Sequence, residues 1–218
     1  MKRIAPQALK VMPVERKDGT YALRLCVHQG LLTRDMLQKL QDVMNVFHLN
    51  DLRATTGQKF NLEGVSADKL DAVIDALGTR VAKCPPAISV CSGGGQCKFG
   101  QQETREMTDR LLEVVKKHGP YPYKVKSGVS GCGTGCGLSS IRDIGLVGSA
   151  KGWTVLYGGS ARNNAAPGLE LAKGIDADQA LELIANGLEY YKENGKNKER
   201  VSGMVRRLGS EAIFNALT

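Results

Sequence analysis

Two pairs of cysteines in glycine-rich segments constrain this chain more than any other feature of its sequence. Cys91 and Cys97 enclose the segment S-G-G-G-Q, and Cys132 and Cys136 enclose G-T-G. Because glycine has no side chain, little except backbone can lie near these four sulfur atoms. Clustered cysteines are typical of a metal centre, since the thiolate binds soft metal ions strongly. The sequence therefore predicts a metal site built from two loops.

Zinc and an iron–sulfur cluster are the two centres that four cysteines most often hold. Structural zinc sites usually have about two to four residues between paired cysteines. The first pair here is spaced more widely, and glycine surrounds both pairs. A [4Fe–4S] cube is larger than one ion, and nearby glycine backbone can supply amide donors to its sulfides. We therefore favour a [4Fe–4S] cluster held by all four cysteines, with zinc as the alternative.

The two remaining cysteines, Cys26 and Cys84, stand alone in the sequence, and we expect both to be ordinary small apolar residues. The first residues are not followed by the apolar core of a signal peptide, and no apolar run reaches membrane-spanning length. The chain is therefore expected to be cytoplasmic, with no membrane association. In that compartment thiols stay reduced, so six cysteines do not indicate a disulfide scaffold.

The formal net charge of +8 suggests an acidic partner. Nucleic acid is a common partner for such a chain, but aromatic residues make up only 5% and none are interleaved with a basic run. A polyanionic small molecule or an acidic protein fits the charge equally well. We therefore expect no nucleic-acid partner.

Hydrophobic periodicity predicts an α+β chain. Its first part reads β-α-β-β-α, which is about half of a ferredoxin-like sheet and leaves an edge that needs a partner. The strand at residues 20–28 carries Arg24 on its polar face, whereas residues 1–19 are expected to be a loosely structured lead-in. The other elements predicted here are a helix capped by Thr33, strands at residues 52–56 and 59–65, and a helix capped by Ser66.

A change of composition at residues 83–86 divides the chain into residues 1–80 and 81–218. In the second part, strands at residues 87–90 and 123–130 each lead to a cysteine pair. Lys124 and Lys126 lie on the latter strand, where alternation directs both ammonium groups to one side. Such a pair is most often a solvated face, but beside a cluster it forms an anion site. The other predicted elements are a helix at residues 101–118, a strand at residues 153–157, a helix at residues 176–193 and a terminal helix. Asp176 and Gln179 resemble a capping box at the start of the third of these.

Several motifs occur together in this order: Y-A-L-R-L, R-A-T-T-G-Q-K-F-N-L-E-G-V, C-x5-C, Y-P-Y-K-V-K, S-G-C-x3-C and I-R-D-I-G-L-V-G. The combination resembles the sirohaem-dependent nitrite and sulfite reductase family, and the resemblance covers most of the chain. It implies an α+β fold with a ferredoxin-like half-domain at residues 1–80 and an α/β cluster-binding domain at residues 81–218.

By this resemblance the four cysteines bind a [4Fe–4S] cluster, and Cys136 also ligates the iron of a sirohaem. Lys124, Lys126 and Arg24 match the family's cations that bind the substrate oxyanion. Sirohaem is a polycarboxylate, so it would suit the positive charge of the chain. Four further cations are candidates to contact its carboxylates, although an ordinary solvated role is slightly favoured for each: Arg53, Lys59, Arg142 and Arg162.

The implied activity is the six-electron reduction of sulfite to sulfide, with nitrite as the alternative substrate and a protein such as a ferredoxin as electron donor. The larger family members contain two copies of the module, so a single copy also implies a homodimer. Two departures weaken the catalytic assignment: Gly57 replaces an arginine of the usual T-T-R-Q motif, and residues 133–135 lack the usual proline and asparagine. The remaining alternatives are a sirohaem-free iron–sulfur carrier or redox sensor, and a basic zinc-stabilised binding protein.

Overall fold

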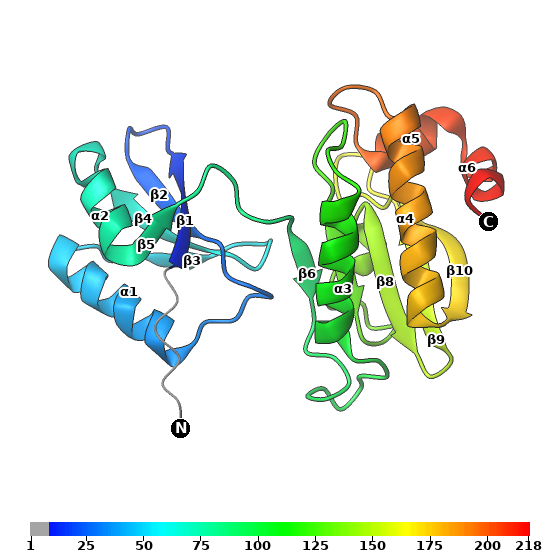
Figure 1. The fold of residues 1–218 in the computed structure, drawn as a ribbon, viewed down its shortest axis with the longest axis horizontal. Helices are drawn as coiled ribbons and strands as arrows, with labels where there is room; N and C mark the ends of the chain where they lie inside the picture. The colour runs from blue at the N-terminus through cyan, green and yellow to red at the C-terminus, as the bar shows by residue number, and fades with distance from the viewer. Residues whose placement is uncertain (1–8) are drawn as a thin grey trace. The chain divides into compact units, whose positions relative to one another are not determined.

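The structure, a computed structural model, describes residues 9–218 and contains two compact units, which divide between Pro85 and Pro86 (Figure 1). Each unit contains one five-stranded mixed sheet with helices packed against it. The α+β class predicted from the sequence is therefore confirmed. None of the helices in the described residues is long and apolar enough to cross a membrane.

The first unit is built on a sheet with the strand order β3-β4-β2-β1-β5. β1 pairs antiparallel with β2 and parallel with β5, and β4 joins β2 to β3 through antiparallel ladders. The strands are β1 (Leu9–Glu15), β2 (Tyr21–Leu25), β3 (Leu52–Ala54), β4 (Phe60–Val65) and β5 (Gly78–Arg80).

The predicted lead-in is wrong for residues 9–15, which form strand β1 beside β2. Pro13 hid this strand, because proline cannot donate a hydrogen bond to a sheet ladder. β5 pairs with Leu9, Lys10 and Val11, so within residues 9–218 only β2 pairs with β1 at Pro13. A strand tolerates proline at such an edge. The rest of the predicted lead-in, residues 1–8, lies outside the described residues.

Two helices, α1 (Arg34–Phe47) and α2 (Leu70–Leu77), pack on one face of this sheet. The hydroxyl of Thr33 accepts a hydrogen bond from the backbone of Met36 at 3.3 Å, so the predicted helix cap is confirmed. The core between helices and strands consists of buried aliphatic side chains that include Leu23, Leu25, Leu40, Val43, Leu62 and Val73.

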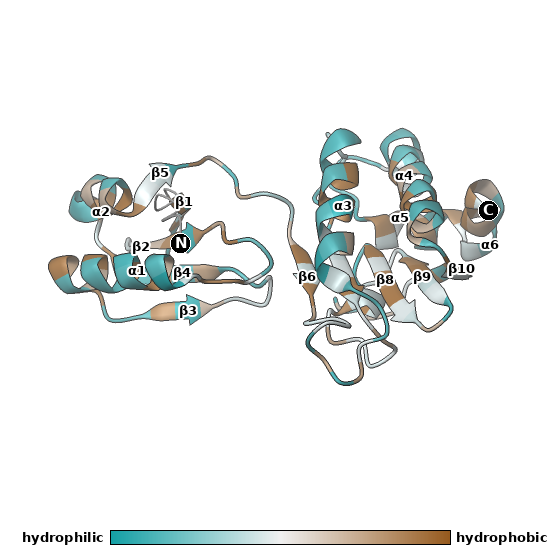
Figure 2. Ribbon diagram, turned by 60° about the horizontal axis from the view of Figure 1, so that its bottom comes forward, coloured by the Kyte–Doolittle hydropathy of each residue, from teal (hydrophilic) through white to brown (hydrophobic). Residues whose placement is uncertain are grey.

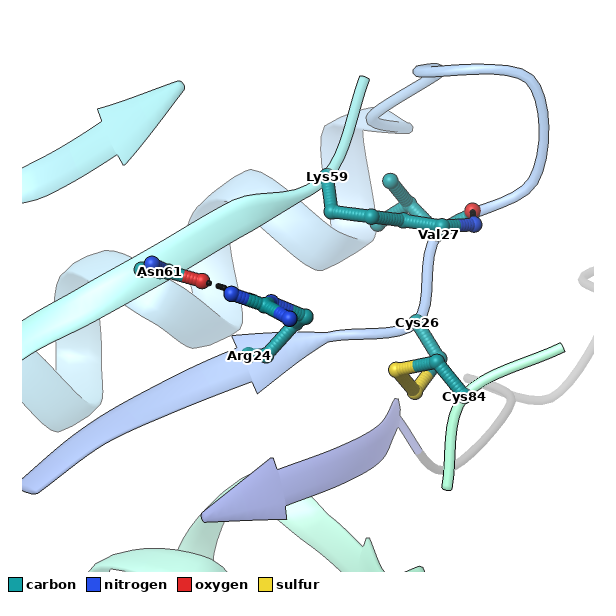
Figure 3. The surroundings of a disulfide bond; sticks show 6 residues. All are labelled: Arg24, Cys26, Val27, Lys59, Asn61 and Cys84. Atoms are coloured by element: carbon teal, nitrogen blue, oxygen red, sulfur yellow. Dashed lines mark hydrogen bonds between the residues drawn. A yellow bond between two sulfur atoms is a disulfide. The ribbon is translucent and has the colours of Figure 1, made fainter. Parts of the chain in front are cut away.

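Cys26 and Cys84 are not lone apolar residues, because they form a disulfide bond (Figure 3). Their Cα atoms are 5.2 Å apart, which is within the usual range for this bond. The sequence did not indicate the pairing, because 58 positions separate the two residues and no pattern connects them. The bond joins the residue after β2 to the segment that leads to the second unit.

The second unit contains a sheet with the order β10-β9-β8-β7-β6. β6, β7 and β8 run parallel, and β9 and β10 continue the sheet in antiparallel pairings. Two of these strands, β8 and β10, were not predicted. The strands are β6 (Ile88–Val90), β7 (Ser127–Ser130), β8 (Ile144–Ser149), β9 (Gly152–Tyr157) and β10 (Leu169–Ile175).

Helices α3 (Thr104–Lys117) and α4 (Ala177–Asn194) contribute one side of the core of this unit. Their apolar residues pack with Val90, Val129, Leu146 and Val155 of the strands. Figure 2 shows that β6 and β8 are largely hydrophobic. The predicted capping box at Asp176 is confirmed, and the predicted terminal helix is two short helices, α5 (Val201–Leu208) and α6 (Ser210–Leu217).

Candidate cluster and anion site

The two cysteine loops lie at the same end of the second sheet, because β6 and β7 are parallel neighbours. Cys91 directly follows β6, and Cys132 lies two residues beyond the end of β7. Backbone hydrogen bonds join the loops: the amides of Gln101 and Gln102 both donate to the carbonyl oxygen of Gly131, at 2.8 and 3.0 Å. The fold thus brings together two segments that lie far apart in the sequence.

Glycine is required where these loops touch. A Cβ atom at Gly93 would lie 2.4 Å from the hydroxyl oxygen of Thr104, and one at Gly131 would lie 2.8 Å from the carbonyl oxygen of Gln102. Gly133, by contrast, has open space around it. The glycines therefore serve two purposes: some let the loops pack closely, and others leave room next to the cysteines.

Hydrogen-bond donors lie close to two of the four sulfur atoms. The amide of Gly131 donates to Sγ of Cys91 at 3.2 Å. The hydroxyl and the backbone amide of Thr134 lower the pKa of Cys132 below its usual value. Donors of this kind stabilise a thiolate, which is the form that binds metal. Three of the cysteines are half-buried, whereas Cys136 is exposed.

Within residues 9–218, no three cysteine, histidine or carboxylate side chains are arranged around a single metal ion. A [4Fe–4S] cube places a different requirement on its ligands, because each thiolate binds a different iron of a larger body. The chemistry of the site suits such a cube: thiols on two joined loops, with amide and hydroxyl donors and open space beside them. The residues present therefore fit a cluster of this kind.

The second cysteine loop folds back over β7. A Cβ atom on Gly128 would lie 2.6 Å from the carbonyl oxygen of Gly137, and the amide of Gly137 donates to Oγ of Ser130 at 3.0 Å. Because side chains alternate along an extended chain, Lys126, Gly128 and Ser130 share one face. Cys136 precedes Gly137 and therefore lies beside the face that carries Lys126.

Lys124 and Lys126 precede β7 and do not belong to it, because the strand begins at Ser127. The predicted alternation still holds: Val125 is buried in the core, Lys124 is exposed and Lys126 is half-buried. Burial lowers the pKa of Lys126, as do the charges of Arg200, Arg142 and Lys124, whereas Asp143 opposes this shift. The two lysines thus lie in a positively charged part of the second unit.

Asp143 organises this region, and the sequence analysis did not single it out. Its carboxylate is fully buried, accepts a hydrogen bond from the backbone amide of Lys126 at 2.7 Å, and forms a salt bridge with Arg200. The backbone carbonyl oxygen of Asp143 accepts a hydrogen bond from the backbone amide of Gly158 at 2.7 Å. One acidic residue therefore joins the lysine segment to α5 and to the loop after β9. The available signal was a carboxylate directly before the apolar run that starts at Ile144, in the motif I-R-D-I-G-L-V-G.

Arg142 and Arg162 lie in different parts of the same unit. The guanidinium of Arg142 donates to Oγ of Ser89 on β6 at 2.9 Å, and burial lowers its pKa. Ile88 and Val90 face the core, so Ser89 and the guanidinium lie on the opposite face of the sheet. Arg162 lines a pocket of about 350 Å³, and three further cations share its lining: Lys198, Arg200 and Arg206.

The other three predicted cations belong to the first unit. Nε of Arg24 donates to the side chain of Asn61 at 3.2 Å (Figure 3). The strand register aligns Arg24 with Asn61 and Asn61 with Arg53, so these residues form a row across β2, β4 and β3. Arg53 also pairs with Glu63. The row occupies the side of the sheet opposite the helices.

Lys59 lies two residues before Asn61, and its ammonium group donates to the carbonyl oxygen of Val27. Burial lowers the pKa of Lys59. Gly57, which stands where the family usually has arginine, lies in the same turn between β3 and β4. Lys59 is therefore the cation that this turn contributes to the polar side of the sheet.

Comparison with known proteins identifies both units. The family model described as the nitrite and sulphite reductase 4Fe-4S domain matches residues 81–218, and the model of the nitrite/sulfite reductase ferredoxin-like half domain matches residues 14–79. The chain belongs to the nitrite and sulphite reductase family. It is therefore an oxidoreductase, and the family resemblance drawn from its motifs is confirmed.

An assimilatory-type sulfite reductase of Nitratidesulfovibrio vulgaris is 34% identical over 94% of this chain and 95% of that protein. A nitrite reductase [NAD(P)H] of Bacillus subtilis is 30% identical over 93% of the chain, which covers only 26% of that protein. In fold, the chain is similar to the NirA protein of Mycobacterium tuberculosis, with a TM-score of 0.76, 22% identity, and coverage of 93% of this chain and 41% of that one.

Proposed function

We propose that this protein is a sulfite reductase haemoprotein that reduces sulfite to sulfide with six electrons at a sirohaem coupled to a [4Fe–4S] cluster. Cys91, Cys97, Cys132 and Cys136 would hold the cluster, and Cys136 would also bind the sirohaem iron. The observation that carries this proposal is the return of the second cysteine loop over β7. This return supports the proposal, because the exposed Cys136 directly precedes Gly137, which packs on the same face as the candidate substrate lysine, Lys126.

The chain's own residues would bind the substrate and supply protons. Sirohaem, when bound, supplies the iron that binds the oxyanion and passes it electrons. The ammonium groups of Lys124 and Lys126 would hold the negative oxygens, because cations stabilise charge where it accumulates. An ammonium group with a lowered pKa also releases its proton more readily, and the oxygens of sulfite leave as water only after protonation. Arg24 would add a third cation from the first unit.

The remaining cations would bind the carboxylates of sirohaem. Arg142 lies on the same face as the lysines, and Arg162 lines a pocket whose other cations include Arg200. Arg200 is already paired with Asp143, so the charge left for a ligand comes mainly from Arg162, Lys198 and Arg206. Arg53 and Lys59 would contribute from the first unit. Paired guanidinium–carboxylate contacts are strong, which suits a cofactor with many carboxylates.

Sulfite is the preferred substrate in this proposal, because the relative matched along almost its whole length is named a sulfite reductase. Nitrite is the alternative, since relatives that share one segment with this chain are named nitrite reductases. The electrons would come from a separate protein such as a ferredoxin. A positively charged surface favours encounter with an acidic donor of this kind.

Serine in place of any one of the four candidate ligands should reduce the iron and acid-labile sulfide content strongly, because serine does not provide a thiolate. Iron and sulfide analysis of anaerobically purified Cys91→Ser, Cys97→Ser, Cys132→Ser and Cys136→Ser proteins measures this. Cys84→Ser is the matched control, since Cys84 lies in the first unit and should leave the iron content unchanged. Full cluster content in any of the four variants would remove that residue from the ligand set.

The visible spectrum of the same wild-type preparation distinguishes the candidate functions. Sirohaem gives an intense Soret band and a red band, a cluster alone gives a broad brown shoulder, and zinc gives no colour. Protein with sirohaem bands should also turn over sulfite with a chemical electron donor. A stable cluster without sirohaem, after expression with ample sirohaem, would favour the electron-carrier alternative.

We also propose that the chain forms a two-fold homodimer in which each protomer completes the site of the other, because closed pairs are the commonest oligomers and this chain has one copy of the module. Because Cys136 and the lysines belong to the second unit of one chain, the partner would contribute Arg24. Mixing Cys136→Ser chains with Arg24→Met chains should then restore activity, since one of the two sites in a mixed dimer is intact. Light scattering gives the mass independently. No recovery on mixing would place each site within a single chain.

A further inference from the structure

The disulfide bond between Cys26 and Cys84 lies at the start of the connection between the two units (Figure 3). Cys26 directly follows β2, and Cys84 directly precedes Pro85 and Pro86. Both cysteines are half-buried. A disulfide is rare in a compartment that keeps thiols reduced, so this bond calls for a role of its own.

The disulfide changes the length of the connection. Without it, the last backbone anchor that residues 9–85 provide is the amide of Val81, which donates a hydrogen bond to the carbonyl oxygen of Val11 at 2.8 Å. The first anchor in the second unit is the carbonyl oxygen of Ala87, which accepts the amide of Ser127 at 3.2 Å. The disulfide moves the anchor of the first unit forward from Val81 to Cys84. Only two prolines then lie between the anchored residues.

This difference is large on the scale of the units. An extended chain advances at most about 3.6 Å per residue, so the connection from Val81 can span about 20 Å and the connection from Cys84 about 10 Å. The shorter connection is also stiff, because each proline ring fixes one backbone angle and restricts the residue before it. The bond therefore replaces a loose connection with a short and rigid one.

We propose that Cys26 and Cys84 form a reversible redox switch that sets the length of this connection. In the oxidising direction, two protein thiols exchange with a small-molecule or protein disulfide, which leaves as two thiols while the Cys26–Cys84 bond forms. A dithiol reductant reverses the exchange, so electrons and protons balance in both directions. The proposal of a switch depends only on the disulfide and on the connection between the units, and it does not depend on the proposed function.

The position of the bond gives the switch a consequence for the candidate site. Cys26 lies two residues after Arg24. The carbonyl oxygen of the next residue, Val27, accepts a hydrogen bond from the ammonium group of Lys59 (Figure 3). Oxidation therefore anchors the connection beside two cations that the first unit would contribute to the site. This consequence, unlike the switch, rests on the proposed function.

Cleavage after Lys83 tests the bond directly, because this exposed lysine immediately precedes Cys84. A lysine-specific protease divides the chain there into residues 1–83 and 84–218. In the oxidised protein the two pieces should stay joined through Cys26 and Cys84, and should separate when dithiothreitol is added. The pieces of Cys26→Ser should separate without reductant. Separation of the unreduced wild-type pieces would overturn the proposal.

Equilibration of the full chain with glutathione buffers tests whether the bond switches. After alkylation, mass spectrometry of the Cys26 and Cys84 peptides reports their thiol fraction apart from the four candidate ligands. The fraction should pass from mostly reduced to mostly oxidised within the range of buffers, and cleavage at Lys83 should be about tenfold faster in the reduced protein, because tethered segments open less often. A bond intact in every buffer, or cleavage unaffected by reduction, would overturn the switch.

Discussion

Lys126→Met should lower the turnover of sulfite by about two to three orders of magnitude, which is the usual cost of removing a charge-assisted contact to the transition state. Methionine preserves the length and the apolar part of the side chain but removes the charge. Lys126 lies on the face next to Cys136, and its lowered pKa favours the release of its proton. Steady-state kinetics with a chemical electron donor measure the effect, and the iron content should stay unchanged.

Two further variants sharpen this prediction. Lys126→Arg keeps the positive charge but does not release a proton near neutral pH, so KM for sulfite should stay near the wild-type value while kcat stays low. Lys117→Met is the matched control, because Lys117 is exposed at the end of α3 and should leave turnover unchanged. Wild-type turnover in Lys126→Met would return this lysine to the role of a solvated residue.

Asp143→Asn should destabilise the second unit by about 3–5 kcal/mol, because it removes one partner of a buried ion pair and leaves the other charge uncompensated. The Asp143 side chain is fully buried and that of Arg200 is 14% exposed, so water cannot replace the lost contact well. Asparagine has nearly the same size as aspartate, so packing changes little. Thermal unfolding followed by circular dichroism should show a midpoint lower by roughly 10 °C.

Asp178→Asn is the matched control for this variant, because Asp178 pairs with Arg110 on the surface and its side chain is 90% exposed. An exposed pair contributes at most about 1 kcal/mol. Asp143 also opposes the lowering of the Lys126 pKa, so Asp143→Asn should lower that pKa further. The alkaline side of the activity profile, where Lys126 loses its proton, should then move to lower pH. Equal unfolding midpoints for the two variants would contradict the role given to Asp143.

Much of the architecture could be predicted from the sequence where one physical signal dominated. The helices were recognised because their apolar residues recur with helical spacing, and the capping box at Asp176 marked the start of α4. The two lysines were placed on one face by alternation alone, and the burial of Val125 between them agrees with it. Local patterns of this kind need no knowledge of distant contacts.

Strands β8 and β10 were missed because their sequences contain features that weaken a strand pattern, and contacts with neighbouring segments stabilise the strands nevertheless. β8 contains Gly145 and Gly148, which weaken a strand pattern. Both are needed because the chain packs closely there: a Cβ atom at Gly145 would lie 2.1 Å from the carbonyl oxygen of Ser139. β10 carries irregularities in its register with β9, which disturb the alternation. These reasons become visible only when the neighbouring segment is in place.

Two features of the sites depended on long-range pairing, and for that reason sequence reasoning missed them. The role of Asp143 depends on Arg200, which lies on a different element. The disulfide joins Cys26 to Cys84 across most of the first unit, so each cysteine looked isolated. Individual residue types thus indicated the chemistry of the cluster, whereas the partners that hold side chains in position came from the fold.

The backbone joins between the two cysteine loops have a consequence for the order of assembly. Gln101 and Gln102 reach Gly131 through main-chain amides, and the loops extend from strands that are anchored in a large apolar core. These contacts use main-chain atoms alone, so no metal ligand is needed to make them. The two loops can therefore pair while the polypeptide folds, before any metal binds.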